Sequence, residues 1–69
     1  MAGEVKSAAE ATEIARNFIK KYRVIAAPLK AVREGGAWLV EIDVGPLFKS
    51  VAKVRIDALT GEVLEYAIP

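Results

Sequence analysis

The sequence contains no cysteine and no histidine. Without cysteine the chain can form neither disulfide bonds nor thiolate metal sites, so a disulfide-stapled secreted mini-protein is excluded. Without histidine as well, the common nucleophile–base pairs and metal sites with nitrogen and sulfur ligands cannot be assembled. We therefore expect no catalytic residue, no cofactor and no metal site, and we do not expect an enzyme.

A dominant charge of one sign and a long apolar run are also missing. Ten basic and nine acidic residues give a net charge of +1, which offers no electrostatic reason to expect nucleic acid or a membrane surface as a partner. No apolar run approaches the ~18 residues of a membrane span. Residues 1–6 have neither the basic nor the apolar region of a signal peptide, so we expect a cytoplasmic protein.

Glutamine is absent and Asn17 is the only asparagine, whereas lysine, arginine and glutamate are plentiful. This composition is a trend of hyperthermophile proteins, such as those of thermophilic archaea. A chain of 69 residues forms one domain that buries only about 60% of its unfolded surface, and its 54% hydrophobic content can supply a rich core. We expect residues 1–6 to be a flexible arm and residues 7–69 to be the domain.

A helix is predicted to begin at Ser7. The Ser7–Glu10 spacing fits a capping box, in which the Ser7 hydroxyl accepts the backbone N–H of Glu10 and the Glu10 carboxylate accepts that of Ser7. The β-branched Val24 follows the helical pattern, so we expect the helix to end near Tyr22 or Arg23. Apolar residues recur at helical spacing and form one stripe: Ala11, Ile14, Ala15, Phe18, Ile19 and Tyr22.

From Leu29 onward the apolar residues alternate with polar ones, which indicates strands. Pro28 cannot donate to a ladder and belongs at a strand start or an edge. We predict four strands at about 28–34, 37–44, 52–58 and 62–68. The fold class is therefore α+β, with one N-terminal helix packed on one face of a three- to four-stranded antiparallel meander sheet.

The turns predict the register of the two outer hairpins. Gly35-Gly36 is a two-residue loop, because glycine supplies the positive φ that such turns need, and it sets Lys30 opposite Glu41. The last hairpin has a four-residue loop or a three-residue loop with Gly61 in a left-handed bulge. We prefer the second, because it sets Arg55 opposite Glu65 and keeps the apolar residues on one face.

The middle connection, residues 45–51, is less determined. If Glu41 faces Arg55, the row Lys30, Glu41, Arg55, Glu65 alternates in sign across all four strands, and such opposed pairs contribute roughly 0.2–1 kcal/mol each. The helix stripe then covers one apolar face, with Arg33 placed to stack on Trp38 at its edge. That face holds Leu29, Ala31, Trp38, Val40, Ile42, Val44, Ala52, Val54, Ile56, Leu64, Tyr66 and Ile68.

Three segments of the chain resemble the PepSY domain: residues 11–19, residues 36–43 and residues 54–64. The most specific part is the Trp-x-Val strand, followed by Val-x-Ile-Asp-x-x-Thr-Gly-Glu-Val. The family includes modules in the propeptides of thermolysin-type metallopeptidases. The resemblance implies a helix on an antiparallel sheet, and an interaction or inhibitory role rather than catalysis.

Few residues stand out as candidate sites. Glu41 and Asp43 are the only close carboxylate pair, but a hard cation usually needs six or more oxygen ligands, so we expect each to pair with a neighbouring base. We interpret Trp38 and Tyr66 as core aromatics. Apolar residues predicted to face solvent are the candidate partner interface: Leu39, Leu47, Phe48, Val51 and Val63.

The preferred hypothesis is a non-catalytic protein-interaction module that self-associates, for instance as a homodimer, or binds another protein. One alternative is a PepSY-type inhibitor or regulator of a peptidase, which rests on the resemblance alone. The other is a domain that binds a small ligand or metal between helix and sheet, near Glu41, Asp43, Trp38 and Tyr66.

Overall fold

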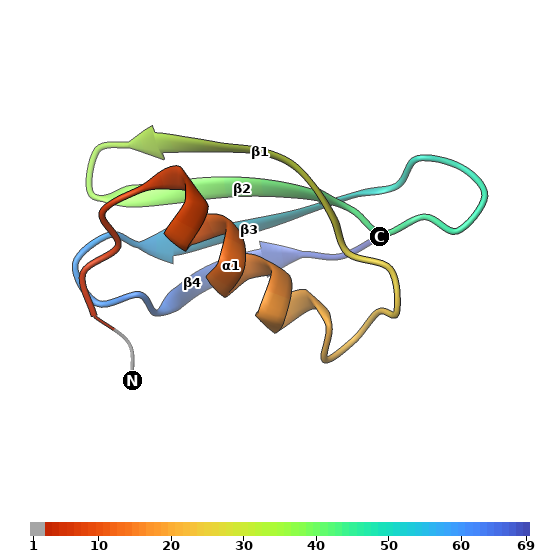
Figure 1. The fold of residues 1–69 in the computed structure, drawn as a ribbon, viewed down its shortest axis with the longest axis horizontal. Helices are drawn as coiled ribbons and strands as arrows, with labels where there is room; N and C mark the ends of the chain where they lie inside the picture. The colour runs from red at the N-terminus through yellow and green to blue at the C-terminus, as the bar shows by residue number, and fades with distance from the viewer. Residues whose placement is uncertain (1–2) are drawn as a thin grey trace.

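A computed structural model describes residues 3–69, and the first two residues of the expected arm lie outside the described residues. The elements are α1 (Ala8–Ile19), β1 (Ala27–Glu34), β2 (Ala37–Asp43), β3 (Val51–Asp57) and β4 (Val63–Ala67). The strands form one antiparallel sheet in chain order, and α1 lies on one face of it (Figure 1). The predicted α+β fold is confirmed.

The helix begins as predicted. The Ser7 Oγ accepts a hydrogen bond of 3.1 Å from the backbone N–H of Glu10. The reciprocal bond differs from the prediction, because the Glu10 carboxylate accepts the backbone N–H of Lys6, at 2.7 Å, in place of that of Ser7. Glu10 therefore ties the chain before the cap to the first helical turn.

The helix ends at Ile19, earlier than the predicted end near Tyr22 or Arg23. The backbone N–H groups of Lys21 and Tyr22 bond to carbonyls three residues back. This tighter winding is common at the ends of α-helices. The apolar stripe is also divided, because Ala11, Ala15 and Ile19 are fully buried whereas Ile14 and Phe18 are only partly buried.

The first hairpin turns at Gly35-Gly36 as predicted, with Gly35 at φ +60°. Lys30 lies opposite Glu41, and their side chains form an ion pair of 3.8 Å. On the N-terminal side of Lys30 the register shifts, so that Pro28 lies opposite Ile42 in place of the predicted Leu29. Leu29, predicted on the buried face, is 41% exposed.

The predicted register between β2 and β3 is wrong by two residues. Glu41 lies opposite Lys53, and Arg55 lies opposite Leu39. Because a shift of two preserves the faces of a strand, the apolar face stays intact. The predicted four-charge row is replaced by two separate ion pairs in neighbouring rows, Lys30–Glu41 and Arg55–Glu65.

The last hairpin combines the two loops that the sequence allowed. Gly61 has φ +79°, and Arg55 lies opposite Glu65, as predicted. Next to the turn, however, Ile56 lies opposite Val63, and the register shifts at Leu64. Val63 therefore packs against the core, and Leu64, predicted to be buried, is 53% exposed.

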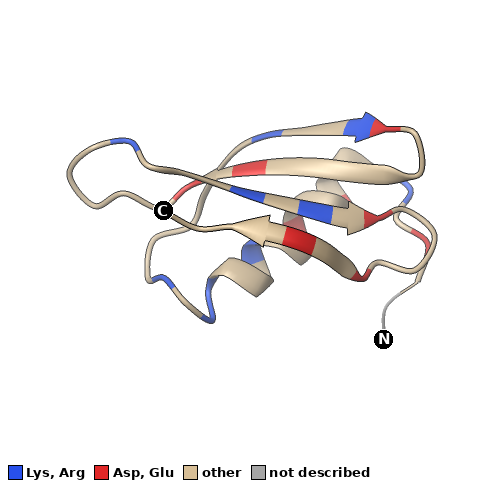
Figure 2. Cartoon of the chain, turned by 180° about the vertical axis from the view of Figure 1, so that it is seen from behind, with Lys and Arg blue, Asp and Glu red and all other residues tan. Residues whose placement is uncertain are grey.

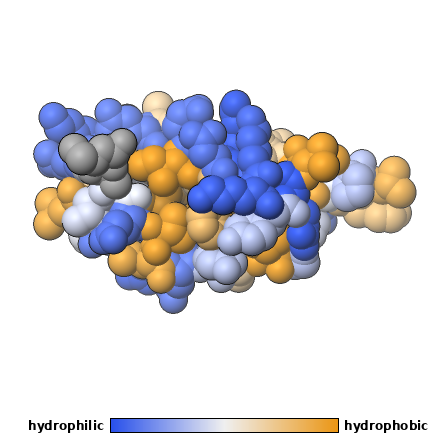
Figure 3. All heavy atoms as spheres, turned by 90° about the horizontal axis from the view of Figure 1, so that it is seen from below, coloured by the Kyte–Doolittle hydropathy of each residue, from blue (hydrophilic) through white to orange (hydrophobic). Residues whose placement is uncertain are grey.

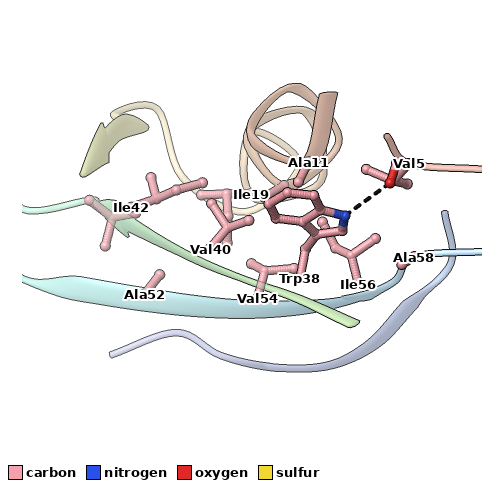
Figure 4. Packing of buried hydrophobic residues seen from close by; sticks show 12 residues of the cluster. Val5, Ala11, Ile19, Trp38, Val40, Ile42, Ala52, Val54, Ile56 and Ala58 are labelled. Carbon is pink, nitrogen blue, oxygen red and sulfur yellow. Dashed lines mark hydrogen bonds between the residues drawn. The ribbon is translucent and has the colours of Figure 1, made fainter. Parts of the chain in front are cut away.

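The core lies between α1 and the middle strands (Figure 4). Its largest fully buried side chains are Val5, Ile19, Val40, Ile42, Val54 and Ile56. The predicted flexible arm is in fact anchored, because the Val5 N–H donates to the Ala58 carbonyl at 2.7 Å. The Trp38 indole N–H donates to the Val5 carbonyl at 3.0 Å, which satisfies a buried donor that would otherwise cost stability.

Candidate protein-interaction surfaces

A groove of about 1020 Å³ opens beside α1. It exists because α1 packs mainly on β1 and β2, less on β3, so the start of β4 has no helix above it. We name it the α1–β4 groove; its lining includes apolar Val5, Ile14, Phe18 and Val63, and charged Glu4, Glu10, Glu13 and Lys21. Figure 3 looks at the side that is lowest in Figure 1 and shows apolar surface between charged side chains.

An aromatic cluster continues the apolar lining of the groove. The ring centroid of Phe18 lies 4.8 Å from that of Tyr66, edge to face, and 5.5 Å from that of Tyr22. The two tyrosine rings stack at 6.1 Å. Tyr22 and Tyr66 are 50% and 52% exposed, so about half of each tyrosine remains uncovered by residues 3–69.

A second apolar surface is the loop between β2 and β3, whose tip, residues 46–49, projects at one end of the molecule (Figure 1). Leu47 and Phe48 are 87% and 84% exposed. Scattered apolar side chains on a surface are ordinary, but two adjacent large ones at a projecting tip are costly to leave in water. These two residues were predicted to be exposed, and that prediction is confirmed.

The loop is held in a defined shape by Asp43. Its carboxylate accepts the backbone N–H groups of Gly45, at 3.0 Å, and Ser50, at 3.1 Å. These two hydrogen bonds lower the pKa of Asp43 below its usual value, with a smaller contribution from the charge of Lys49. Gly45 is required here, because a Cβ at this position would overlap the carbonyl oxygen of Phe48.

The predicted interface residues do not form one patch. Leu47 and Phe48 share the loop tip, while Leu39 and Val51 are half-buried on the sheet face away from α1. Val63, predicted to face outward, lines the groove on the opposite face. Sequence reasoning placed Phe18 and Tyr66 in the core, since an amphipathic pattern shows which face is apolar but not how far the covering helix reaches.

The four residues named for the alternative ligand or metal site do not lie together. Glu41 pairs with Lys30 as predicted, but Asp43 binds backbone N–H groups instead of a base. Among residues 3–69 no group of three or more acidic side chains is placed to hold a metal ion. Arg33 lies 5.7 Å from the Trp38 ring, as the sequence suggested, and Tyr66 belongs to the separate aromatic cluster.

Figure 2 marks where the charged residues lie along the strands. On β2 and β3 they alternate with buried apolar residues, which places residues such as Glu41, Lys53 and Arg55 on the face away from α1. In the described part of the chain the ion pairs are Lys30–Glu41 and Arg55–Glu65. Glu4 and Glu13 at the groove, and Lys49 at the loop tip, therefore have no ion-pair partner within residues 3–69. Both apolar surfaces thus carry charges that form no ion pair within the described residues.

No helix among residues 3–69 is long and apolar enough to cross a membrane. No protein-family model matches the chain, and neither the curated proteins nor the solved structures contain a match to it. The resemblance to the PepSY domain therefore stays a prediction made from the residues.

Proposed function

We propose that this protein is a non-catalytic protein-interaction module that binds another protein chain in the α1–β4 groove. The observation that carries the proposal is the open side of the helix–sheet layer, where Phe18, Tyr22 and Tyr66 form a half-exposed aromatic cluster beside the groove. Aromatic side chains with one apolar and one polar end are enriched at protein interfaces.

The groove also has the size and lining of a binding site. Its volume of about 1020 Å³ slightly exceeds the roughly 300–1,000 Å³ typical of ligand sites. Apolar Ile14 and Val63 line it, and in its charged lining three glutamates outnumber Lys21. A bound chain segment would bury the apolar lining, which is the main source of binding free energy.

Site-specific photo-crosslinking in host-cell lysate tests the proposal. A photoreactive phenylalanine analogue replaces Asn17, an exposed residue that lines the groove, and in a matched protein replaces Lys30, which is exposed on the other face of the sheet. We expect a discrete cross-linked protein band from position 17 and none from position 30. Equal or absent cross-linking at the two positions would refute the proposal.

A further inference from the structure

We infer that the occupant of the α1–β4 groove is the loop tip, residues 46–49, of a second copy of the same chain. This inference rests on the proposed function and specifies its partner. The two surfaces that the fold leaves unexplained, an apolar groove and an apolar projection, then explain each other.

The first match between the two surfaces is apolar. Leu47 and Phe48 project from the loop with more than four-fifths of their surface in water. The groove offers Ile14, Phe18 and Val63, all partly buried and packed against the core. Inserting a leucine and a phenylalanine between such side chains removes apolar surface from water on both copies.

The second match is in charge. Lys49 follows Phe48 directly and has no ion-pair partner among residues 3–69. Arg23, which lies beside the loop, adds a second positive charge there and donates hydrogen bonds to the backbone oxygen atoms of Tyr22 and Pro69. In the groove three glutamates outnumber Lys21, so mainly opposite charges meet when a loop tip enters it, which favours this docking over a neutral alternative.

Self-association through the free edge of β4 is a weaker alternative. The edge of that strand presents Glu65, and Glu62 precedes the strand. Antiparallel pairing of two such edges brings like charges close together, which is destabilising. These acidic residues therefore disfavour self-association through the β4 edge.

The positions of the two surfaces limit how copies can join. The molecule is 35 Å long, with the β2–β3 loop at one end and the β3–β4 turn, whose Gly61 lines the groove, at the other (Figure 1). We therefore expect the loop tip of one copy to enter the groove of another, either head to tail, which builds rings or open chains, or reciprocally, which closes a pair. The hydrogen bonds from the N–H groups of Gly45 and Ser50 to Asp43 hold the loop in one shape before binding. Less conformational entropy is therefore lost when the tip docks.

Analytical ultracentrifugation of two complementary variants tests the inference. Phe48→Asp removes the projection but leaves the groove intact. Glu13→Lys/Asn17→Lys reverses the charge of the groove at two exposed helix positions but leaves the loop intact. We expect the mass of the unmodified protein to rise with concentration, and the self-association constant of each variant to fall by at least about tenfold.

Mixing the two variants is the decisive step. One intact groove and one intact loop remain in the mixture, so we expect a 1:1 complex that does not grow further. Two controls should associate like the unmodified protein: Val24→Asp, an apolar-to-acid change at a 98% exposed site, and Val24→Lys/Glu34→Lys, which matches the charge change of the groove variant. Circular dichroism verifies that every variant is folded.

Three outcomes would overturn the inference. The first is an unmodified protein that stays monomeric at millimolar concentration, and this leaves the proposed function to be decided by the cross-link at position 17. The second is self-association of the unmodified protein with no complex in the mixture, which indicates a contact other than that of loop tip and groove. The third is an equal loss in the control variants.

Discussion

On the sheet face that packs against α1, the middle strands β2 and β3 form a closed side and the edge strand β4 an open side. The two sides differ in how far the helix buries their side chains. On β2 and β3, Val40, Ile42, Val54 and Ile56 are fully buried, whereas on β4 both Tyr66, on the same face, and Leu64, in the bulge beside it, are more than half exposed. The alternation of apolar and polar residues is similar in both. What differs is the cover: a helix is about 10–12 Å wide, and four strands spaced about 4.8 Å apart span more than that.

The largest contrast between the closed and the open side should come from truncating one aliphatic side chain on each. Ile56→Ala leaves a cavity in the closed side and should lower the free energy of unfolding by about 3 kcal/mol. Leu64→Ala removes a side chain that is already half in water and should cost less than about 1 kcal/mol. Urea denaturation measures both; equal losses would mean that β4 is as well packed as β3.

The second contrast concerns the N-terminal segment, which closes one end of the core. Val5→Ala should lower the free energy of unfolding by about 2 kcal/mol, because Val5 is only 2% exposed and two buried methyl groups are lost. Val24→Ala makes the same chemical change at a 98% exposed site and should have almost no effect. If the two variants melt at the same temperature, the segment is not part of the core.

A smaller contrast is expected between the two ion pairs. The Glu41 side chain is 21% exposed and that of Glu65 is 70% exposed. Because exposed ion pairs are weak and salt-screened, Glu41→Gln should cost about 0.5 kcal/mol and Glu65→Gln about 0.2 kcal/mol. Denaturation at low and high salt compares them, and a larger loss at Glu65 would reverse the expected order.

The smallest effect is expected at the half-exposed Asp43, and it depends on pH. Its pKa is lowered in the folded protein by the N–H groups of Gly45 and Ser50. The stabilisation is therefore complete above the unfolded pKa of 3.8 and is lost as the pH falls through the folded pKa. The melting temperatures of the unmodified protein and of Asp43→Asn should converge on acidification; a constant gap down to pH 2 would contradict this.

Much of the fold follows from local patterns in the sequence. The Ser7 cap and the Gly35-Gly36 turn each have one strong physical interpretation, and a left-handed Gly61 was the preferred of two; all three are present. The register between β2 and β3 could not be predicted from the apolar pattern, because a slip by two residues leaves every side chain on its original face. Contacts across the loop set the length of that connection: the Asp43 carboxylate accepts the N–H groups of Gly45 and Ser50, and the Val44 N–H donates to the Ser50 carbonyl.

The candidate site was harder to predict than the fold. Leu47 and Phe48 were identified because they sit in a connection beside Gly45-Pro46, where no strand can bury them. The groove was missed because the swap of Val63 and Leu64 depends on a bulge at one residue, and a bulge changes the face without changing the composition. Which strands one short helix covers depends on how the helix packs on the sheet, and no local sequence pattern specifies that packing.

The tryptophan and the two tyrosines lie on different sides of the molecule, so their optical signals report on different regions. The single tryptophan, Trp38, lies in the closed core with its indole bound to Val5, so its fluorescence reports on the N-terminal segment and on β2. Both tyrosines, Tyr22 and Tyr66, lie on the open side. Tryptophan emission and tyrosine absorbance are thus independent optical readouts of the two sides, without any added label.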